Sequence, residues 1–209
     1  MGANVPINSN FLGVPRNPIV ATDRRFAFPQ QVNLFLQEKI YSWTGDDFSI
    51  TDFNGIPYFR CGGRAFSFRE KKVINDIYGI PIYNIKHELF SLRGRFKLYY
   101  GDQGGRILAS VDPISTFGSL YSVTFFNQAT GQNDYLELAC DLMGSRCGIF
   151  HGNAKTGAPM ICRINKQYDA KNFFYNKQNY VVEIAPNVDA ALMIGLGIIF
   201  DELRNDSHE

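Results

Sequence analysis

The feature that most constrains this chain is an apolar run near its C-terminus, within residues 188–203 (VDAALMIGLGIIFDEL). Residues 190–200 are eleven consecutive positions without a polar side chain. Asn187 and Asp189 are typical of a helix start, and Pro186 excludes helix before them. A helix with no polar face has to be enclosed by protein or lipid, and a membrane-spanning helix needs about 20 apolar residues. Because the run is shorter, we predict a helix enclosed by the rest of the chain, and no transmembrane span.

Length and charge indicate one globular domain. The chain has 209 residues and a net charge of +1, so no overall field draws it to nucleic acid. Residues 1–31 are rich in Pro and Asn and show no period, which predicts a flexible N-terminal arm on the surface. We expect residues 32–209 to form a single domain. The four cysteines include no CxxC pair and no secretory segment opens the chain, which indicates reduced thiols in a cytoplasmic or nuclear protein.

A repeated turn motif organises the middle of the chain. DFNGIPYFRC (52–61) is echoed by DIYGIPIYNI (76–85), and GDQGGRILAS (101–110) has a similar skeleton. The expected turn glycines lie 24 to 27 residues apart, and β-branched and aromatic residues flank each of them, as hairpins require. These glycines are Gly55, Gly79, Gly104, Gly131 and Gly157. Five hairpins supply ten strands, and strands at 32–43 and 178–185 raise the number to about twelve.

Side chains alternate in polarity along these strands. In RFKLYY, Phe96 and Leu98 face one way and Arg95 faces the other, so the sheet has one buried and one solvated face. Closing a meander removes its exposed edges, and about twelve strands have room for a helix about 10–12 Å across. We therefore predict a mainly β fold: a closed antiparallel barrel of about twelve strands that encloses the hydrophobic C-terminal α-helix.

Three stretches resemble one known family. They are 67–102 (SFREKKVINDIYGIPIYNIKHELFSLRGRFKLYYGD), 39–61 (KIYSWTGDDFSITDFNGIPYFRC) and 181–203 (VVEIAPNVDAALMIGLGIIFDEL), and together they resemble the LURP-one-related family. The resemblance implies a tubby C-terminal-like barrel of about twelve strands around a central helix, distantly similar to phospholipid scramblases. It also implies links to plant defence and, through tubby domains, binding of phosphatidylinositol bisphosphate. A shared fold does not by itself determine function.

The titratable residues are not arranged as a catalytic or metal site. His87, His151 and His208 are dispersed and belong to no HExxH or His-x-Glu pattern. Cys140 and Cys147 flank a turn, and as free thiols they are expected in the core or a loop. We predict no catalytic residues, no bound metal and no cofactor.

The candidate binding residues are basic. Arg93, Arg95 and Lys97 alternate along one strand, so we expect all three to point outward. Further cations on the strand one hairpin earlier complete the predicted headgroup-binding set: Arg69, Lys71 and Lys72. Such a patch suits a phosphorylated headgroup, which Arg binds in bidentate fashion and Lys binds as a point charge. The alternative is an ordinary charged outer face, since Glu70 and Glu88 interrupt the patch.

These observations predict a non-enzymatic binding or adaptor module. We expect its outer basic patch to recognise phosphoinositide or other anionic headgroups at a membrane surface, which places it in the cytoplasm or nucleus or at the periphery of the plasma membrane. The alternatives are a scramblase-like or lipid-handling protein and a scaffold for a protein partner in stress or defence signalling. A helix that fills the lumen argues against a ligand inside the barrel. No nucleic-acid partner is expected.

Overall fold

Twelve β-strands and one long α-helix make up most of the described chain. The computed structural model describes residues 11–38, 46–62, 72–88, 94–115, 119–141, 145–167 and 179–206. Its elements are η1 (Arg24–Phe26), β1 (Val32–Glu38), β2 (Asp46–Thr51), β3 (Pro57–Gly62), β4 (Lys72–Asp76), β5 (Pro81–His87), β6 (Phe96–Tyr100), β7 (Ile107–Pro113), β8 (Leu120–Asn127), β9 (Gln132–Cys140), β10 (Arg146–Phe150), η2 (Ala154–Thr156), β11 (Met160–Gln167), β12 (Asn179–Ile184) and α1 (Ala190–Asp206).

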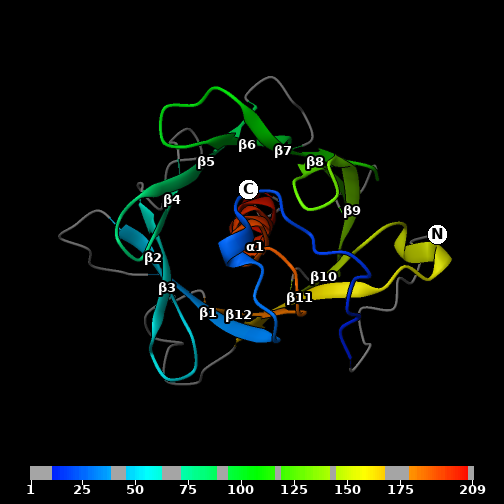
Figure 1. Cartoon of the computed structure of the whole chain (residues 1–209), viewed down its shortest axis with the longest axis horizontal. Helices are drawn as coiled ribbons and strands as arrows, with labels where there is room; N and C mark the ends of the chain where they lie inside the picture. Colours follow the sequence, from blue (N-terminus) through cyan, green and yellow to red (C-terminus); the bar gives the residue numbers. More distant parts are fainter. Residues whose placement is uncertain are drawn as a thin grey trace.

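The strands form one closed antiparallel barrel. Each strand pairs with the strand that follows it in the chain, and β1 pairs with β12 to close the circle (Figure 1). At the closure, Leu34 lies opposite Val182 and Leu36 lies opposite Tyr180. This arrangement confirms the predicted fold class, because the sheet has no free edge once its first and last strands pair.

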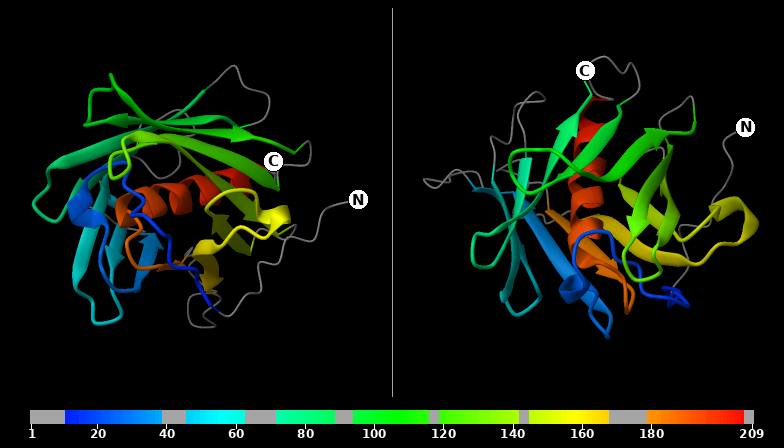
Figure 2. Two further views of the ribbon diagram at one scale, coloured as in Figure 1. Left: turned by 45° about the vertical axis from the view of Figure 1, so that its right-hand side comes forward. Right: turned by 45° about the horizontal axis from the view of Figure 1, so that its top comes forward.

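Helix α1 runs through the lumen of the barrel (Figures 1 and 2). Every residue of 190–200 is buried, and inward side chains such as Leu34 on β1 and Ile164 on β11 belong to the same core. The helix therefore replaces water along the whole inner wall, as the uniformly apolar sequence predicts. Within the described residues, no helix has both the length and the apolar composition that a membrane crossing requires.

The repeated motif forms the same tight turn twice. In the first copy, the Asp52 carboxylate accepts hydrogen bonds from the backbone N–H groups of Asn54 (2.9 Å) and Ile56 (2.8 Å). Gly55 follows with a φ of +79°, a conformation that favours glycine. The second copy repeats both bonds around Asp76, so the shared aspartate and glycine are turn-forming residues.

Residues 11–31, which we call the N-terminal segment, are not the loose surface arm that their composition predicts, whereas residues 1–10 of the predicted arm lie outside the described residues. Residues 11–31 pack against the barrel end at which α1 starts (Figure 2). Ile19 is fully buried; its N–H donates to the Asn187 carbonyl (2.9 Å), and its own carbonyl accepts from the N–H of Asp189 (2.9 Å). This differs from the prediction because the proline-rich sequence also contains apolar residues, among them Ile19 and Phe26. These residues belong to the core and cover it at the barrel end.

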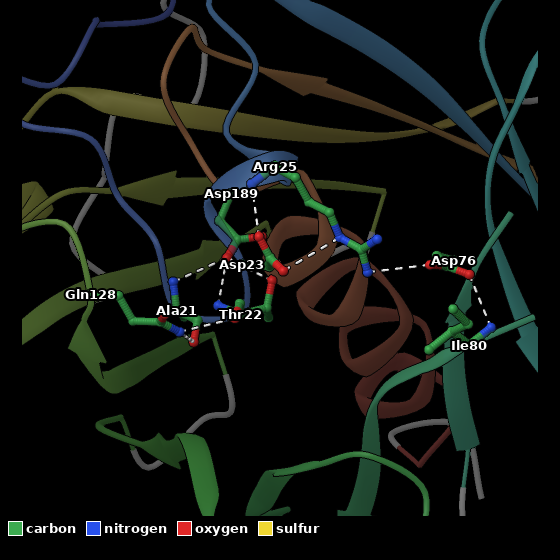
Figure 3. Close-up of polar contacts among 8 residues, drawn as sticks. All are labelled: Ala21, Thr22, Asp23, Arg25, Asp76, Ile80, Gln128 and Asp189. Carbon is green, nitrogen blue, oxygen red and sulfur yellow. Dashed lines mark hydrogen bonds and ion pairs between the residues drawn. The ribbon is translucent and has the colours of Figure 1, made fainter. Parts of the chain in front are cut away.

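Asp189 joins this segment to the helix. Its carboxylate is fully buried and accepts hydrogen bonds from the N–H groups of Ala21 (3.0 Å) and Thr22 (2.7 Å) and from the Thr22 hydroxyl (2.9 Å) (Figure 3). The N–H of Leu192 donates a further bond to it (3.2 Å). Burial raises the pKa of the Asp189 carboxyl group, although the bonds from Thr22, Leu192 and Ala21 oppose this effect. All of these partners are donors, so the site suits an acceptor-only group.

The same segment spans the barrel mouth from side to side. The Gln128 side-chain amide, in the β8–β9 turn, donates to the carbonyls of Ala21 and Thr22 (both 2.9 Å). On the opposite side, the Arg25 guanidinium lies 3.2 Å from the carboxylate of Asp76, the last residue of β4 before the β4–β5 turn (Figure 3). The N-terminal segment therefore ties together two turns that lie far apart around the barrel.

The two glycines of α1 have different surroundings. A Cβ at Gly195 would lie 2.4 Å from the Tyr83 hydroxyl oxygen, which donates to the Ala191 carbonyl (2.6 Å). A Cβ at Gly197 would lie 3.6 Å from its nearest neighbour, a methyl group of Val182, which is an ordinary contact. Only the first glycine is needed for a close approach between the helix and the wall.

The first prediction compares these two positions. Gly195→Ala is expected to destabilise the fold by about 1–3 kcal/mol, because the added methyl overlaps a buried tyrosine. Gly197→Ala is expected to be neutral or to stabilise by up to about 1 kcal/mol, since Ala is the better helix former. Each kcal/mol corresponds to about 2–4 °C in Tm for a chain of this size. Equal Tm values for the two variants would contradict the packing described here.

The second prediction concerns Asp189. Asp189→Asn replaces one acceptor oxygen with an N–H₂ group that faces backbone donors, and we expect a loss of about 2–3 kcal/mol. The matched control is Asp102→Asn in the β6–β7 turn, where the carboxylate bonds to the exposed Gln103 amide; its Tm should stay close to that of the wild type. Thermal unfolding followed by circular dichroism measures both changes.

Candidate functional site

Cations gather on the outer wall of the barrel at β5, β6 and the β6–β7 turn. Lys86 on β5 lies directly opposite Lys97 on β6, and both side chains point away from the lumen. We call four residues the basic face: Lys86, Arg95, Lys97 and Arg106. Like charges directly opposite each other on neighbouring strands destabilise a sheet, so the Lys86–Lys97 pair is the unusual feature of this surface.

Two of these cations have acidic partners. The Lys97 ammonium forms an ion pair with Glu88, and this hydrogen bond raises the pKa of Lys97 against the opposing effect of desolvation. The Arg95 guanidinium lies 3.3 Å from a carboxylate oxygen of Asp112 on β7. Both pairs are at the surface, where an ion pair contributes little to stability and is readily exchanged for another anion.

The other two cations lie against aromatic rings. The Lys86 ammonium is 5.0 Å from the centre of the Tyr99 ring, and the Arg106 guanidinium is 5.3 Å from the centre of the Tyr100 ring. These cation–π contacts orient the two side chains beside the β6–β7 turn without neutralising their charge. Lys86 and Arg106 were missing from the predicted set. Lys86 becomes part of the basic face through the pairing of β5 with β6, which places it opposite Lys97.

The predicted basic residues divide into three groups. Arg95 and Lys97 lie on the outer wall, as expected. Arg69, Lys71 and Arg93 lie outside the described residues, and their role stays a prediction. Lys72 points the other way, into the barrel.

Lys72 is therefore a correction to the predicted set. Its side chain is 5% exposed, and its ammonium forms an ion pair with Glu202 near the end of α1. Burial acts to lower the pKa of Lys72, but the charge and hydrogen bond of Glu202 outweigh it, so this pKa is raised. In the β4 sequence KVIND, Val73 and Ile74 point to opposite faces, so both faces of the strand carry an apolar residue. The sequence therefore does not show whether Lys72 lies on the buried or the exposed face.

A polar pocket opens at another part of the barrel rim. Its volume is about 450 Å³, and it is lined by Asn17, Asn127, Ala129, Thr130, Gln132, Asn133, Asp134 and His151. Here the Asp134 carboxylate lies 2.9 Å from His151 Nε2 and accepts from the Asn127 amide (2.9 Å). Partial burial acts to raise the pKa of Asp134, but the bonds from Asn127, the Tyr135 N–H and His151 outweigh it, so this pKa is lowered.

The Asp134–His151 pair is better explained as part of a structural hydrogen-bond network than as a catalytic dyad. Asn127, which holds Asp134, also donates to the Pro18 carbonyl (3.1 Å) and accepts from the Val20 N–H (3.2 Å). The network therefore attaches the N-terminal segment to the β8–β9 hairpin. A carboxylate with a lowered pKa and three committed donors is a poor general base.

The cysteines lie in the barrel wall. Cys140 on β9 is directly opposite Cys147 on β10, while Cys162 on β11 is also buried. Burial raises the pKa of the Cys147 and Cys162 thiols, which disfavours the reactive thiolate. Within the part of the chain that the structure describes, no three His, Cys, Asp or Glu side chains form a group suited to a metal ion.

The third prediction distinguishes Lys72 from Lys97. Lys72→Gln leaves Glu202 without its buried cation, and losing one partner of a buried ion pair costs up to about 3–5 kcal/mol. Lys97→Gln should leave the Tm nearly unchanged, because that pair is at the surface. Since the pKa of Lys72 is raised, its contribution is present at neutral pH and should fade only as the pH rises above about 10.5. Equal Tm values for the two variants at neutral pH would contradict the inward placement.

Comparison with known proteins places the fold in a family. A family model described as LURP-one-related matches residues 32–201. Among curated relatives, Protein LURP-one-related 15 of Arabidopsis thaliana is 25% identical, over 90% of this chain and 87% of its own length. Protein LURP-one-related 10 of the same plant is 23% identical, over 88% of this chain and 96% of its own length.

A solved structure shares the architecture. An Arabidopsis thaliana protein determined by X-ray crystallography superposes with a TM-score of 0.61 at 20% identity, over 88% of this chain and 98% of that one. At this identity the likeness shows the common fold only. The match to the family model shows more than a common fold, because it extends from β1 to the end of the apolar run in α1. This chain therefore belongs to the LURP-one-related family.

Proposed function

We propose that this protein is a non-enzymatic binding module that recognises phosphate-bearing headgroups at an anionic membrane surface through the basic face. The observation that carries the proposal is the direct opposition of Lys86 and Lys97 on neighbouring strands. Like charges directly opposite each other destabilise a sheet, and an anion bound beside the pair would offset their repulsion. Glu88 already offsets part of this repulsion at Lys97.

The chemistry of the basic face suits a phosphate group. Lys86 and Lys97 supply point charges from one patch of the wall, and Arg95 and Arg106 are donors at its two ends. The ion pairs with Glu88 and Asp112 hold Lys97 and Arg95 in place without excluding another anion, since exposed pairs are weak. A phosphate group that several charged donors contact binds more strongly than one that a single donor contacts.

The filled interior favours recognition on the outside. Residues 190–200 of α1 occupy the space in which a lipid-handling barrel would hold an acyl chain. The Asp134–His151 pair is committed to holding the N-terminal segment, and the Cys147 and Cys162 thiols are buried. These features support a binding role rather than catalysis, and the adaptor role expected from the family resemblance fits such a module.

The fourth prediction tests the basic face. Lys86→Gln combined with Lys97→Gln is expected to weaken binding to phosphatidylcholine vesicles that contain phosphatidylinositol bisphosphate by about tenfold or more. Binding by the wild type should also weaken with added salt, because the contacts are screened over about 8 Å at physiological ionic strength. Vesicle co-sedimentation measures both effects.

A charge-matched control separates the basic face from net charge. Arg146→Gln with Lys155→Gln removes two positive charges from exposed positions elsewhere on the barrel, and its binding should equal that of the wild type. Equal losses in the two double variants would mean that only net charge matters. Wild-type protein that ignores anionic vesicles at low salt would refute the proposed function.

A further inference from the structure

The repeated turns expose apolar side chains that the turn geometry does not require. In the D-x-x-G-I-P motif, the aspartate and glycine form the turn, whereas the isoleucines Ile56 and Ile80 are more than half exposed. Tyr78, at the tip of the second copy, is 80% exposed. A monomer rarely keeps large apolar side chains together at its surface without a function for them.

These side chains come from three consecutive hairpins. The β2–β3, β4–β5 and β6–β7 turns follow one another around one side of the barrel mouth, coloured cyan to green on the left of Figure 1. We call their six most exposed large apolar residues the apolar rim; each is between 48% and 80% exposed. The apolar rim consists of Phe53, Ile56, Tyr78, Ile80, Tyr100 and Ile107.

The turns hold the apolar rim in a fixed position. Tyr78 and Ile80 each donate a backbone N–H to the Asp76 carboxylate, at 3.0 and 2.9 Å. That carboxylate is itself buried and forms an ion pair with Arg25 of the N-terminal segment. A surface that is ordered before binding loses little conformational entropy on contact.

Charge at the third turn favours a partner with phosphates. The Lys86 ammonium would lie only 3.0 Å from a Cβ at Gly104, so this cation sits on the β6–β7 turn itself. Arg106 belongs to the same turn and lies over Tyr100. The carboxylates of the three turns bond within their own turns: Asp52 and Asp76 accept from backbone N–H groups, and Asp102 accepts from the Gln103 amide. Lys86 and Arg106 project as cations beside the apolar rim.

We propose that the three turns are a membrane-docking surface: the apolar rim enters the interface of an anionic bilayer while Lys86 and Arg106 contact lipid phosphates. The inference rests on the proposed function, since the two share Lys86 and Arg106, and it adds how the barrel is oriented on the membrane.

The shape of the apolar rim favours a bilayer over a folded protein. Its side chains stand on three separate projecting turns, and a bilayer interface accommodates such tips without a complementary surface. Tyrosine also suits this depth, because its ring prefers an apolar environment and its hydroxyl prefers water. The cations beside the tips meet the phosphate layer that bounds the hydrocarbon.

The fifth prediction uses vesicles and a soluble phosphate in parallel. Tyr78→Ser with Ile80→Ser should weaken binding to phosphatidylcholine vesicles containing phosphatidylinositol bisphosphate by about tenfold or more. The same variant should bind soluble inositol hexakisphosphate as the wild type does, because the basic face is intact. The matched control is Ile114→Ser with Phe126→Ser, which removes two exposed apolar side chains outside the three turns and should change neither affinity.

The outcomes separate the two proposals. A rim variant that binds vesicles as well as the wild type overturns the docking surface and leaves headgroup recognition standing. Wild-type protein that binds vesicles through the apolar rim but does not bind inositol hexakisphosphate overturns the basic face alone. Wild-type protein that binds neither probe overturns both, and a protein partner then becomes the occupant of the apolar rim.

The depth of the apolar rim in the bilayer can be measured directly, with a variant that still binds vesicles. Tyr78→Trp is conservative at an exposed turn, and vesicles containing brominated phosphatidylcholine should quench its added fluorescence. Ile114→Trp is the control, because Ile114 follows β7 at the opposite end of the barrel. Equal quenching at the two positions, or none at Tyr78→Trp in bound protein, would overturn the insertion of the apolar rim.

Discussion

Burial of the apolar helix α1 is the constraint on which the rest of the structure depends. A helix without a polar face is insoluble unless something covers it on all sides. Twelve strands closed into a barrel do this, and the helix in turn fills a lumen that would otherwise be empty. Wall and helix therefore stabilise each other through one shared core.

The two ends of the helix carry the polar groups that this burial makes costly. At the start, Asp189 is satisfied by backbone donors of the N-terminal segment. Near the end, Asp201 accepts from the Tyr180 hydroxyl and Glu202 pairs with Lys72. Since an unpaired charge in such a place is strongly destabilising, these contacts fix how far the helix lies along the lumen.

A filled interior leaves the outer wall and the rims for recognition. The basic face and the apolar rim meet at the β6–β7 turn, where Lys86 lies near Gly104 and Arg106 lies over Tyr100. A rigid barrel suits such a role, because its turns are held by hydrogen bonds at their bases and keep their side chains in position. In the function we propose, membrane affinity comes from the turns and headgroup selectivity from the wall.

Local patterns in the sequence predict the architecture: the apolar run of α1, the regular turn glycines and the alternation along the strands have periods that specify a helix and hairpins. They also place Arg95 and Lys97 on the outer face. Three features depend on contacts between distant parts of the chain: Lys72 faces the lumen, the proline-rich N-terminal segment covers the barrel mouth, and Lys86 lies opposite Lys97. Local periodicity shows that a strand has two faces, but which face is buried, and which segment covers the open core, depends on pairing between residues far apart in the chain.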